Sequence, residues 1–149
     1  MRYYVALALA EPIPGNAFGT RYPNLQVKDW LQQATGLELS DSMDMFCARY
    51  DHTDYLSCHD DELEGRKIAY IFYLVPDAWA ADDGGALDLF ETDAATGHPG
   101  AVARSLVPTF NSLAFFEVTP RSWHQVRATK RGSHFDPGKR HLCVASAAT

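Results

Sequence analysis

The sequence predicts a mostly β domain, folded as a sandwich or jelly roll, with one or two helices near its N-terminus. From about residue 44 onward, roughly seven short segments rich in β-branched and aromatic residues follow one another, and turn signals separate them about every ten residues. A length of 149 residues suits one domain with a single hydrophobic core. We therefore expect two packed sheets rather than several domains.

The helix is predicted near the N-terminus. Apolar residues at Val27, Trp30, Leu31 and Ala34 follow the i, i+3, i+4, i+7 spacing of an amphipathic helix, and Gly36 marks its end. Residues 11–24 carry three prolines and two glycines and are predicted to form a loop.

The strands follow in order. Residues 45–50 are predicted to form the first of them. Ile68–Val75 is too apolar for an edge, so we expect a central strand that ends before Pro76. The remaining predicted strands are residues 86–90, 102–108, 113–118, 123–128 and 141–145.

Composition limits the classes of partner. The formal net charge of −6 argues against a nucleic-acid groove, which needs a basic patch. No apolar stretch approaches the roughly 20 residues that span a bilayer, so no membrane partner is expected. Cys47, Cys58 and Cys143 are odd in number and show no CxxC spacing. A disulfide framework is therefore not expected, and a reducing compartment, the cytoplasm or the nucleus, is favoured.

A possible metal motif lies just before the predicted central strand. His59 and Asp61 form a His-X-Asp element, and His124 follows near the C-terminus. Two imidazoles and one carboxylate are the ligand set of the facial triad that holds Fe(II) and leaves positions open. In an extended segment residues i and i+2 share a face, so we expect His59 and Asp61, but not Asp60, to point at one metal. A bare His-X-Asp pattern also fits a polar turn before a strand.

Two more side chains are candidates for an acid-binding site. Tyr73 lies on the predicted central strand, either as a core residue or as a hydrogen-bond donor to a carboxylate inside the barrel. Arg140 precedes the last strand, either as a surface residue or as a guanidinium that binds a carboxylate through two hydrogen bonds. In a jelly roll the central strand and the strand that begins at His124 can face each other. The remaining histidines are predicted to lie at the surface: His52, His98, His134 and His141.

From about Tyr22 to Val126 the sequence resembles the catalytic domain of the 2-oxoglutarate and iron-dependent oxygenases that hydroxylate a proline in a small-subunit ribosomal protein. The acidic run HDDELEG is more specific than a bare His-X-Asp and separates this branch from broader prolyl 4-hydroxylase relatives. The residues that carry the resemblance are Cys58–Arg66, Tyr73–Pro76, Gly84-Gly85 with Leu87–Leu89, Phe115–Val118 and His124–Val126.

The resemblance implies a double-stranded β-helix, or jelly roll, with Fe(II) held by His59, Asp61 and His124. It implies that Tyr73 and Arg140 bind the distal carboxylate of 2-oxoglutarate, with Arg131 as the fallback for Arg140. Tyr50 occupies the position of a tyrosine that lines the cosubstrate pocket. The implied reaction hydroxylates C3 of a peptidyl proline while 2-oxoglutarate becomes succinate and carbon dioxide, and ascorbate is an additional candidate cofactor.

The resemblance also sets expectations about domains. Residues 1–21 match nothing in the family, and residues 22–149 are expected to form the oxygenase domain, without the second, non-catalytic barrel of the family. A truncated form is thus expected. Two alternatives remain open: a catalytically incompetent jelly-roll remnant that acts at most as a binding module, and an oxygenase on another substrate, such as a nucleic-acid base or a free amino acid.

Overall fold

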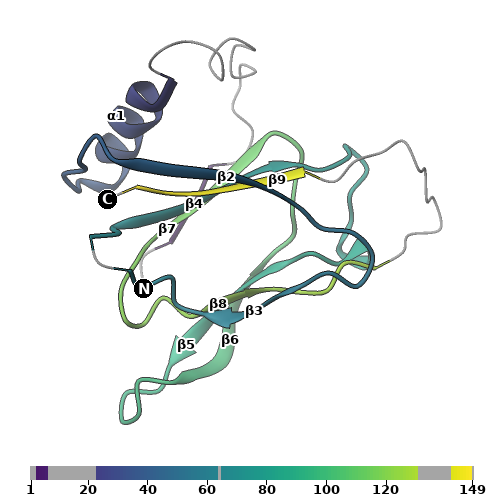
Figure 1. The fold of residues 1–149 in the computed structure, drawn as a ribbon. Helices are drawn as coiled ribbons and strands as arrows, with labels where there is room; N and C mark the ends of the chain where they lie inside the picture. The colour runs from purple at the N-terminus through teal and green to yellow at the C-terminus, as the bar shows by residue number, and fades with distance from the viewer. Residues whose placement is uncertain (1–2, 7–22, 64, 131–141, 149) are drawn as a thin grey trace.

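The computed structural model describes residues 3–6, 23–63, 65–130 and 142–148. Two antiparallel sheets lie face to face, and a helix covers the outer face of the larger one (Figure 1). This arrangement confirms the predicted jelly roll. The five-stranded sheet has the order β1 (Tyr3–Ala6), β7 (Ser112–Glu117), β4 (Ile68–Leu74), β9 (Leu142–Ala148) and β2 (Met43–Arg49). The four-stranded sheet has the order β3 (Leu56–His59), β8 (His124–Val126), β5 (Leu87–Thr92) and β6 (Pro99–Leu106).

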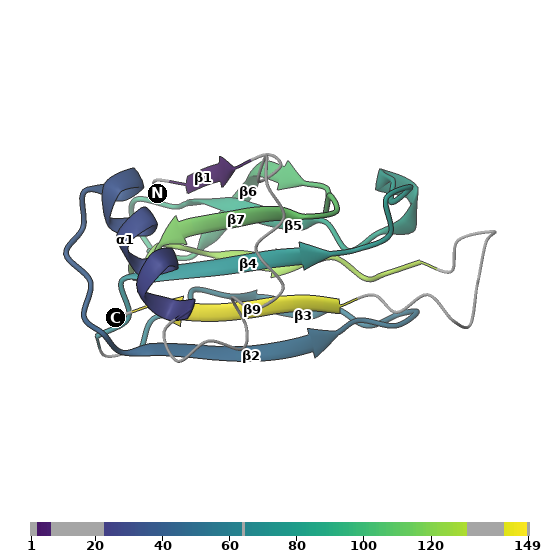
Figure 2. The same ribbon diagram turned by 90° about the horizontal axis from the view of Figure 1, so that it is seen from above.

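Strand β4 is central, as its apolar sequence predicts. It pairs with β7 on one side and with β9 on the other, and Figure 2 shows these strands side by side in the middle of the large sheet. Alternate residues of β4 serve two different cores, because successive side chains point to opposite faces. Ile68, Tyr70 and Phe72 pack on the helix side, whereas Ala69 and Tyr73 face the space between the sheets.

The predicted helix is α1 (Pro23–Thr35). It begins earlier than the apolar pattern indicated, because proline is well tolerated in the first turn of a helix. Leu31 is completely buried against the outer face of the large sheet, and the Trp30 ring meets the Phe115 ring edge-on with 5.3 Å between centroids. Gly36 has a φ of 74° and donates its N–H to the Gln32 carbonyl, which ends the helix as predicted.

A second hydrophobic core fills the space between the two sheets, next to the predicted metal ligands. Its buried members come from both sheets: Ala69, Tyr73, Ala114 and Phe116 from the large sheet, and Leu87 and Leu89 from the small sheet. Strands β4 and β8 lie in opposite sheets, as expected for the central strand and the strand that begins at His124. In the described residues no helix is both long and apolar enough to cross a membrane.

Strand β3 was not predicted. Its four residues are too few to show a periodic pattern, so they were predicted to belong to a loop. Within the part of the chain that the structure describes, the strand pairs with β8 alone, and its register shifts between Leu56 and His59, which marks a β-bulge. Strand β9 also runs further than predicted, to Ala148, because both β2 and β4 pair with its whole length.

Burial of Leu31 should be a main source of stability for α1. We expect Leu31→Ala to lower the free energy of unfolding by about 2–5 kcal/mol, since it leaves a cavity under the helix. Leu63→Ala is the matched control, because Leu63 is 60% exposed and its truncation should change stability by less than about 0.5 kcal/mol. Urea unfolding followed by circular dichroism measures both, and equal losses would contradict this assignment of the core.

Candidate metal centre

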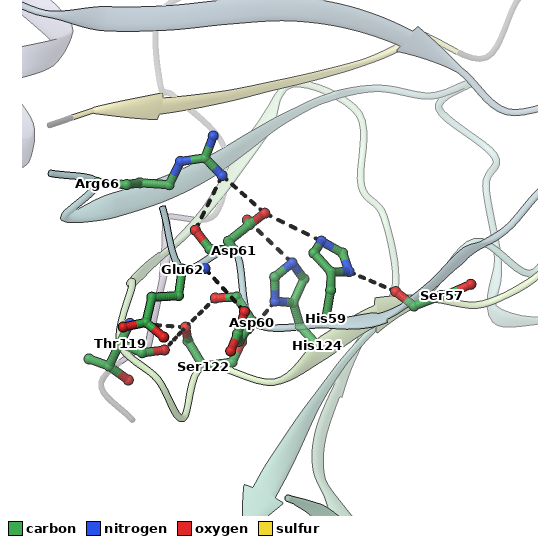
Figure 3. A network of polar contacts seen from close by, with 9 residues as sticks. All are labelled: Ser57, His59, Asp60, Asp61, Glu62, Arg66, Thr119, Ser122 and His124. Carbon is green, nitrogen blue, oxygen red and sulfur yellow. Dashed lines mark hydrogen bonds and ion pairs between the residues drawn. The ribbon is translucent and has the colours of Figure 1, made fainter. Parts of the chain in front are cut away.

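The three predicted metal ligands converge on one point. His59 ends β3, His124 begins β8, and the two residues are direct cross-strand partners. The Asp61 carboxylate faces the Nε2 atoms of both rings: its Oδ1 is 3.4 Å from His59 Nε2, and its Oδ2 is 3.4 Å from His124 Nε2. One ligand atom from each residue falls within 4.8 Å of the other two (Figure 3). The structure therefore brings together the three side chains that sequence spacing singled out.

The backbone reason for this convergence differs from the prediction. Asp61 has a φ of 61°, in the left-handed region, so the chain is not extended there and simple alternation does not place its side chain beside His59. Asp60 is occupied elsewhere, because its Oδ1 accepts the Glu62 N–H at 3.1 Å. The expectation about which carboxylate joins the histidines is thus met, but the extended-strand explanation for it is wrong.

Both imidazoles are oriented in the same way. His59 Nδ1 lies 2.6 Å from the Ser57 carbonyl, and His124 Nδ1 lies 2.8 Å from the Ser122 carbonyl. A carbonyl oxygen can only accept a hydrogen bond, so each Nδ1 must carry its proton. Each Nε2 then points toward Asp61, where its lone pair is available to a metal. Ser57 lies within the stretch of β3, between Leu56 and His59, where the register with β8 shifts.

Ser122 links the two segments that carry the ligands. It is completely buried, and its Oγ accepts the Thr119 N–H at 3.0 Å. The same hydroxyl lies 2.6 Å from the Asp60 carbonyl and 2.7 Å from the Thr119 carbonyl, to either of which it can donate its single hydrogen. Since the Ser122 carbonyl also orients His124, one residue ties the Asp60–Asp61 turn to the second histidine.

Arg66 is a member of the site that sequence reasoning missed. Its Nη1 lies 3.1 Å from Asp61 Oδ1 and 3.4 Å from the Asp61 carbonyl oxygen. The residue ends the run Cys58–Arg66 that carries the family resemblance, but no periodic pattern shows that a loop residue five positions after Asp61 folds back onto it. The only available signal was a cation close to an acidic candidate ligand.

Electrostatics in the site favour a charged Asp61. Burial raises the pKa of Asp61, but the hydrogen bond from His59 and the charges of His124, His59 and Arg66 outweigh burial and hold the pKa below its usual range. The hydrogen bond with Asp61 raises the pKa of His59 against the opposing effect of burial. Burial lowers the pKa of His124. The lowered pKa of Asp61 favours its charged carboxylate, the form that binds a metal.

A cavity of about 170 Å³ adjoins the three ligands between the two sheets. Tyr50 and Tyr73, predicted to line a cosubstrate pocket, both contribute to its wall, and Tyr73 is 5% exposed. Other side chains that line it come from both sheets and the loops: Phe46, Arg66, Ile71, Trp79, Phe116 and Val126. The arrangement combines a metal-ligand set with a mostly apolar cavity, which is the composition of a site that excludes water from a reactive centre.

Several other residues were singled out in the sequence. Arg140, its fallback Arg131, and the histidines His134 and His141 lie outside the described residues. His52 and His98 are exposed, as predicted.

Removing the Ser122 hydroxyl should weaken metal binding. We expect Ser122→Ala to raise the Kd for Mn(II) by about tenfold, the lower end of what loss of an outer-shell partner costs. Ser112→Ala is a matched control, because Ser112 is also buried and donates to the Thr109 carbonyl at 2.7 Å, outside the ligand network. Electron paramagnetic resonance of free Mn(II) measures both variants. An equal change in the two would contradict a positioning role for Ser122.

Comparison with known proteins agrees with this chemistry. The model of the 2OG-Fe(II) oxygenase superfamily matches residues 45–135. The prolyl 3-hydroxylase OGFOD1 of Xenopus laevis is 54% identical over 99 residues, which is 66% of this chain and 19% of that protein. The prolyl 3-hydroxylase sudestada1 of Drosophila melanogaster is 40% identical over 105 residues, 68% of this chain and 19% of that protein. The chain thus spans about a fifth of the length of these curated relatives.

Solved structures show the same fold. A prolyl hydroxylase from Trichoplax adhaerens, solved with a hypoxia inducible factor peptide fragment, has a TM-score of 0.62 at 15% identity, covering 98% of this chain and 62% of that chain. A prolyl-4-hydroxylase from Pseudomonas putida has a TM-score of 0.58 at 22% identity, covering 83% and 59%. The family uses Fe(II) and 2-oxoglutarate, and the two-histidine, one-carboxylate set fits that iron. Because the family model matches more than half of its residues, this chain belongs to the 2-oxoglutarate and Fe(II)-dependent oxygenase superfamily.

Proposed function

We propose that this chain is the oxygenase domain of a peptidyl-prolyl hydroxylase that acts at C3 of a proline in a small-subunit ribosomal protein. The observation that carries the proposal is the convergence of His59, Asp61 and His124 in a chain that is 54% identical over 99 residues to a named prolyl 3-hydroxylase. A ribosomal substrate is consistent with action in the cytoplasm or the nucleus.

In this proposal His59, Asp61 and His124 hold the iron. Fe(II) with 2-oxoglutarate supplies the oxidation of the C–H bond. The two Nε2 atoms and a carboxylate oxygen of Asp61 would hold the metal, and the mostly apolar wall of the cavity would limit the access of bulk water to it. Ser57 and Ser122 fix the tautomer of the two imidazoles through their carbonyls.

The cosubstrate would lie in the cavity that Tyr50 and Tyr73 line. Tyr73 comes from the inner face of β4 and reaches the same cavity as the ligands from the opposite sheet. We propose that its hydroxyl and the Arg140 guanidinium bind the distal carboxylate of 2-oxoglutarate, with Arg131 as the alternative cation. Support comes from the placement of Tyr73 alone, since both arginines lie outside the described residues.

The product of the reaction tests the substrate class. We expect the Fe(II)-loaded chain, given 2-oxoglutarate and isolated small ribosomal subunits, to form succinate and to add one oxygen to a proline. Mass spectrometry of the digested ribosomal proteins identifies the residue, and amino-acid analysis separates 3-hydroxyproline from 4-hydroxyproline. Succinate formation that ribosomal subunits do not stimulate would contradict the ribosomal substrate, and no succinate at all would favour a catalytically incompetent domain.

Neighbouring aspartates give a matched test of the metal ligands. We expect Asp61→Ala to weaken Fe(II) binding by more than about 100-fold, beyond the typical effect of an outer-shell change, because it removes the charged ligand. Asp60→Ala should leave binding within about threefold, since the Asp60 carboxylate caps the Glu62 N–H and points away. Anaerobic Fe(II) titration, with the visible charge-transfer band of the 2-oxoglutarate chelate as readout, measures both. Equal loss in the two variants would refute the assignment.

Metal affinity should decrease as the pH is lowered through the range in which the ligand histidines take up a proton. A ligand histidine must be neutral, so protons compete with the metal below the pKa of the histidine. The pKa of His59 is raised above 6.5 by its hydrogen bond with Asp61, whereas burial holds that of His124 below 6.5. As the pH is lowered, affinity for Mn(II) should therefore begin to weaken before the pH reaches about 6.5, and it should fall more steeply at still lower pH. Affinity that is constant from about pH 8 to about pH 5.5 would contradict histidine ligation.

A further inference from the structure

Arg66 contacts the metal-ligand carboxylate directly. It lies in the loop between β3 and β4, its side chain is only 17% exposed, and Figure 3 shows its guanidinium directed at Asp61. The Nη1 atom lies 3.1 Å from Asp61 Oδ1. A guanidinium stays protonated in proteins, so it is a permanent donor to that oxygen.

The two carboxylate oxygens of Asp61 have different surroundings. Oδ1 has Arg66 Nη1 at 3.1 Å and His59 Nε2 at 3.4 Å, whereas Oδ2 is 3.4 Å from His124 Nε2. A metal bound through both oxygens would compete with Arg66 for Oδ1 and leave this largely buried cation with only the longer contact to the Asp61 carbonyl oxygen, which is costly. A metal bound through Oδ2 alone leaves the Arg66 hydrogen bond intact.

We propose that Arg66 is a positioning residue that makes Asp61 a one-oxygen metal ligand. By holding Oδ1, Arg66 keeps the number of protein ligand atoms at three, so that three positions of a six-coordinate metal stay open. Two of them suit the two oxygens of a 2-oxo acid, and the third is left for dioxygen. The proposal rests on the metal site of the proposed function and adds the cause of its open coordination.

Two simpler roles for Arg66 predict different results. If Arg66 only held the loop in place, its loss would weaken metal binding. If it acted only through its charge, its loss would strengthen binding of the metal cation and weaken binding of the anionic 2-oxo acid, without any change in the number of coordinated waters. Only the positioning role predicts that a water position on the metal is lost.

The test counts water ligands on Mn(II), by the broadening of its electron paramagnetic resonance lines in ¹⁷O-enriched water. We expect about three waters in the unaltered chain and about two in Arg66→Met, because Asp61 then binds through both oxygens. The Kd of the Mn(II)-loaded protein for 2-oxoglutarate should rise about tenfold. Arg66→Lys restores a donor to Oδ1 and should recover the third water.

Lys67→Met is the matched control. Lys67 is adjacent in sequence and exposed, and its Nζ donates to the Glu38 carbonyl at 2.8 Å, so the same loop loses one charge away from Asp61. It should keep three waters. Arg66→Leu serves as a second neutral variant without a hydrogen-bond donor if Arg66→Met does not fold.

Two failures are distinguishable. An unaltered water count in folded Arg66→Met or Arg66→Leu would overturn the positioning role while the metal site stands. Absence of Mn(II) binding in the unaltered chain would overturn the proposed function and the role of Arg66 with it.

Discussion

The pairing of β3 with β8 is the constraint on which the metal centre depends. It sets His59 opposite His124, and it does so with a very short edge strand. The contact is continued beyond the strands, where Thr53 donates its N–H to the Thr129 carbonyl at 2.9 Å and Thr129 donates to the Asp54 carbonyl at 3.0 Å. Short pairing that is extended by loop hydrogen bonds can hold two ligands in register without a long β3.

The other side of β8 is fixed as firmly. Asp88 on β5 is completely buried and accepts hydrogen bonds from Gln125 at 2.9 Å and from Arg127 at 2.6 Å. Gly84, at a φ of 80°, meets Thr129 so closely that an added Cβ would lie 2.2 Å from the Ala128 carbonyl oxygen, so only glycine fits there. The ligand His124 is thus carried by a segment held from both edges, whereas Asp61 lies on a turn that Arg66 and Ser122 have to hold.

The sequence predicted well where a pattern repeats over many residues. Helix α1 follows from apolar periodicity and strand β4 from a continuous apolar run, and the chemistry of a two-histidine, one-carboxylate set singled out His59, Asp61 and His124. Prediction from the sequence failed where the structure depends on the backbone conformation of a few residues. The left-handed φ of Asp61, the bulge before His59 and the return of Arg66 to Asp61 depend on single turns of the backbone, on which periodicity gives no information.

The most direct measurement is an anaerobic crystal structure of the chain with Mn(II) and 2-oxoglutarate. We expect one metal peak at about 2.0–2.2 Å from His59 Nε2, His124 Nε2 and a single oxygen of Asp61, with the other Asp61 oxygen still accepting a hydrogen bond from Arg66. A metal on either Nδ1, a metal bound by Asp60, or a peak away from these three residues would contradict this expectation.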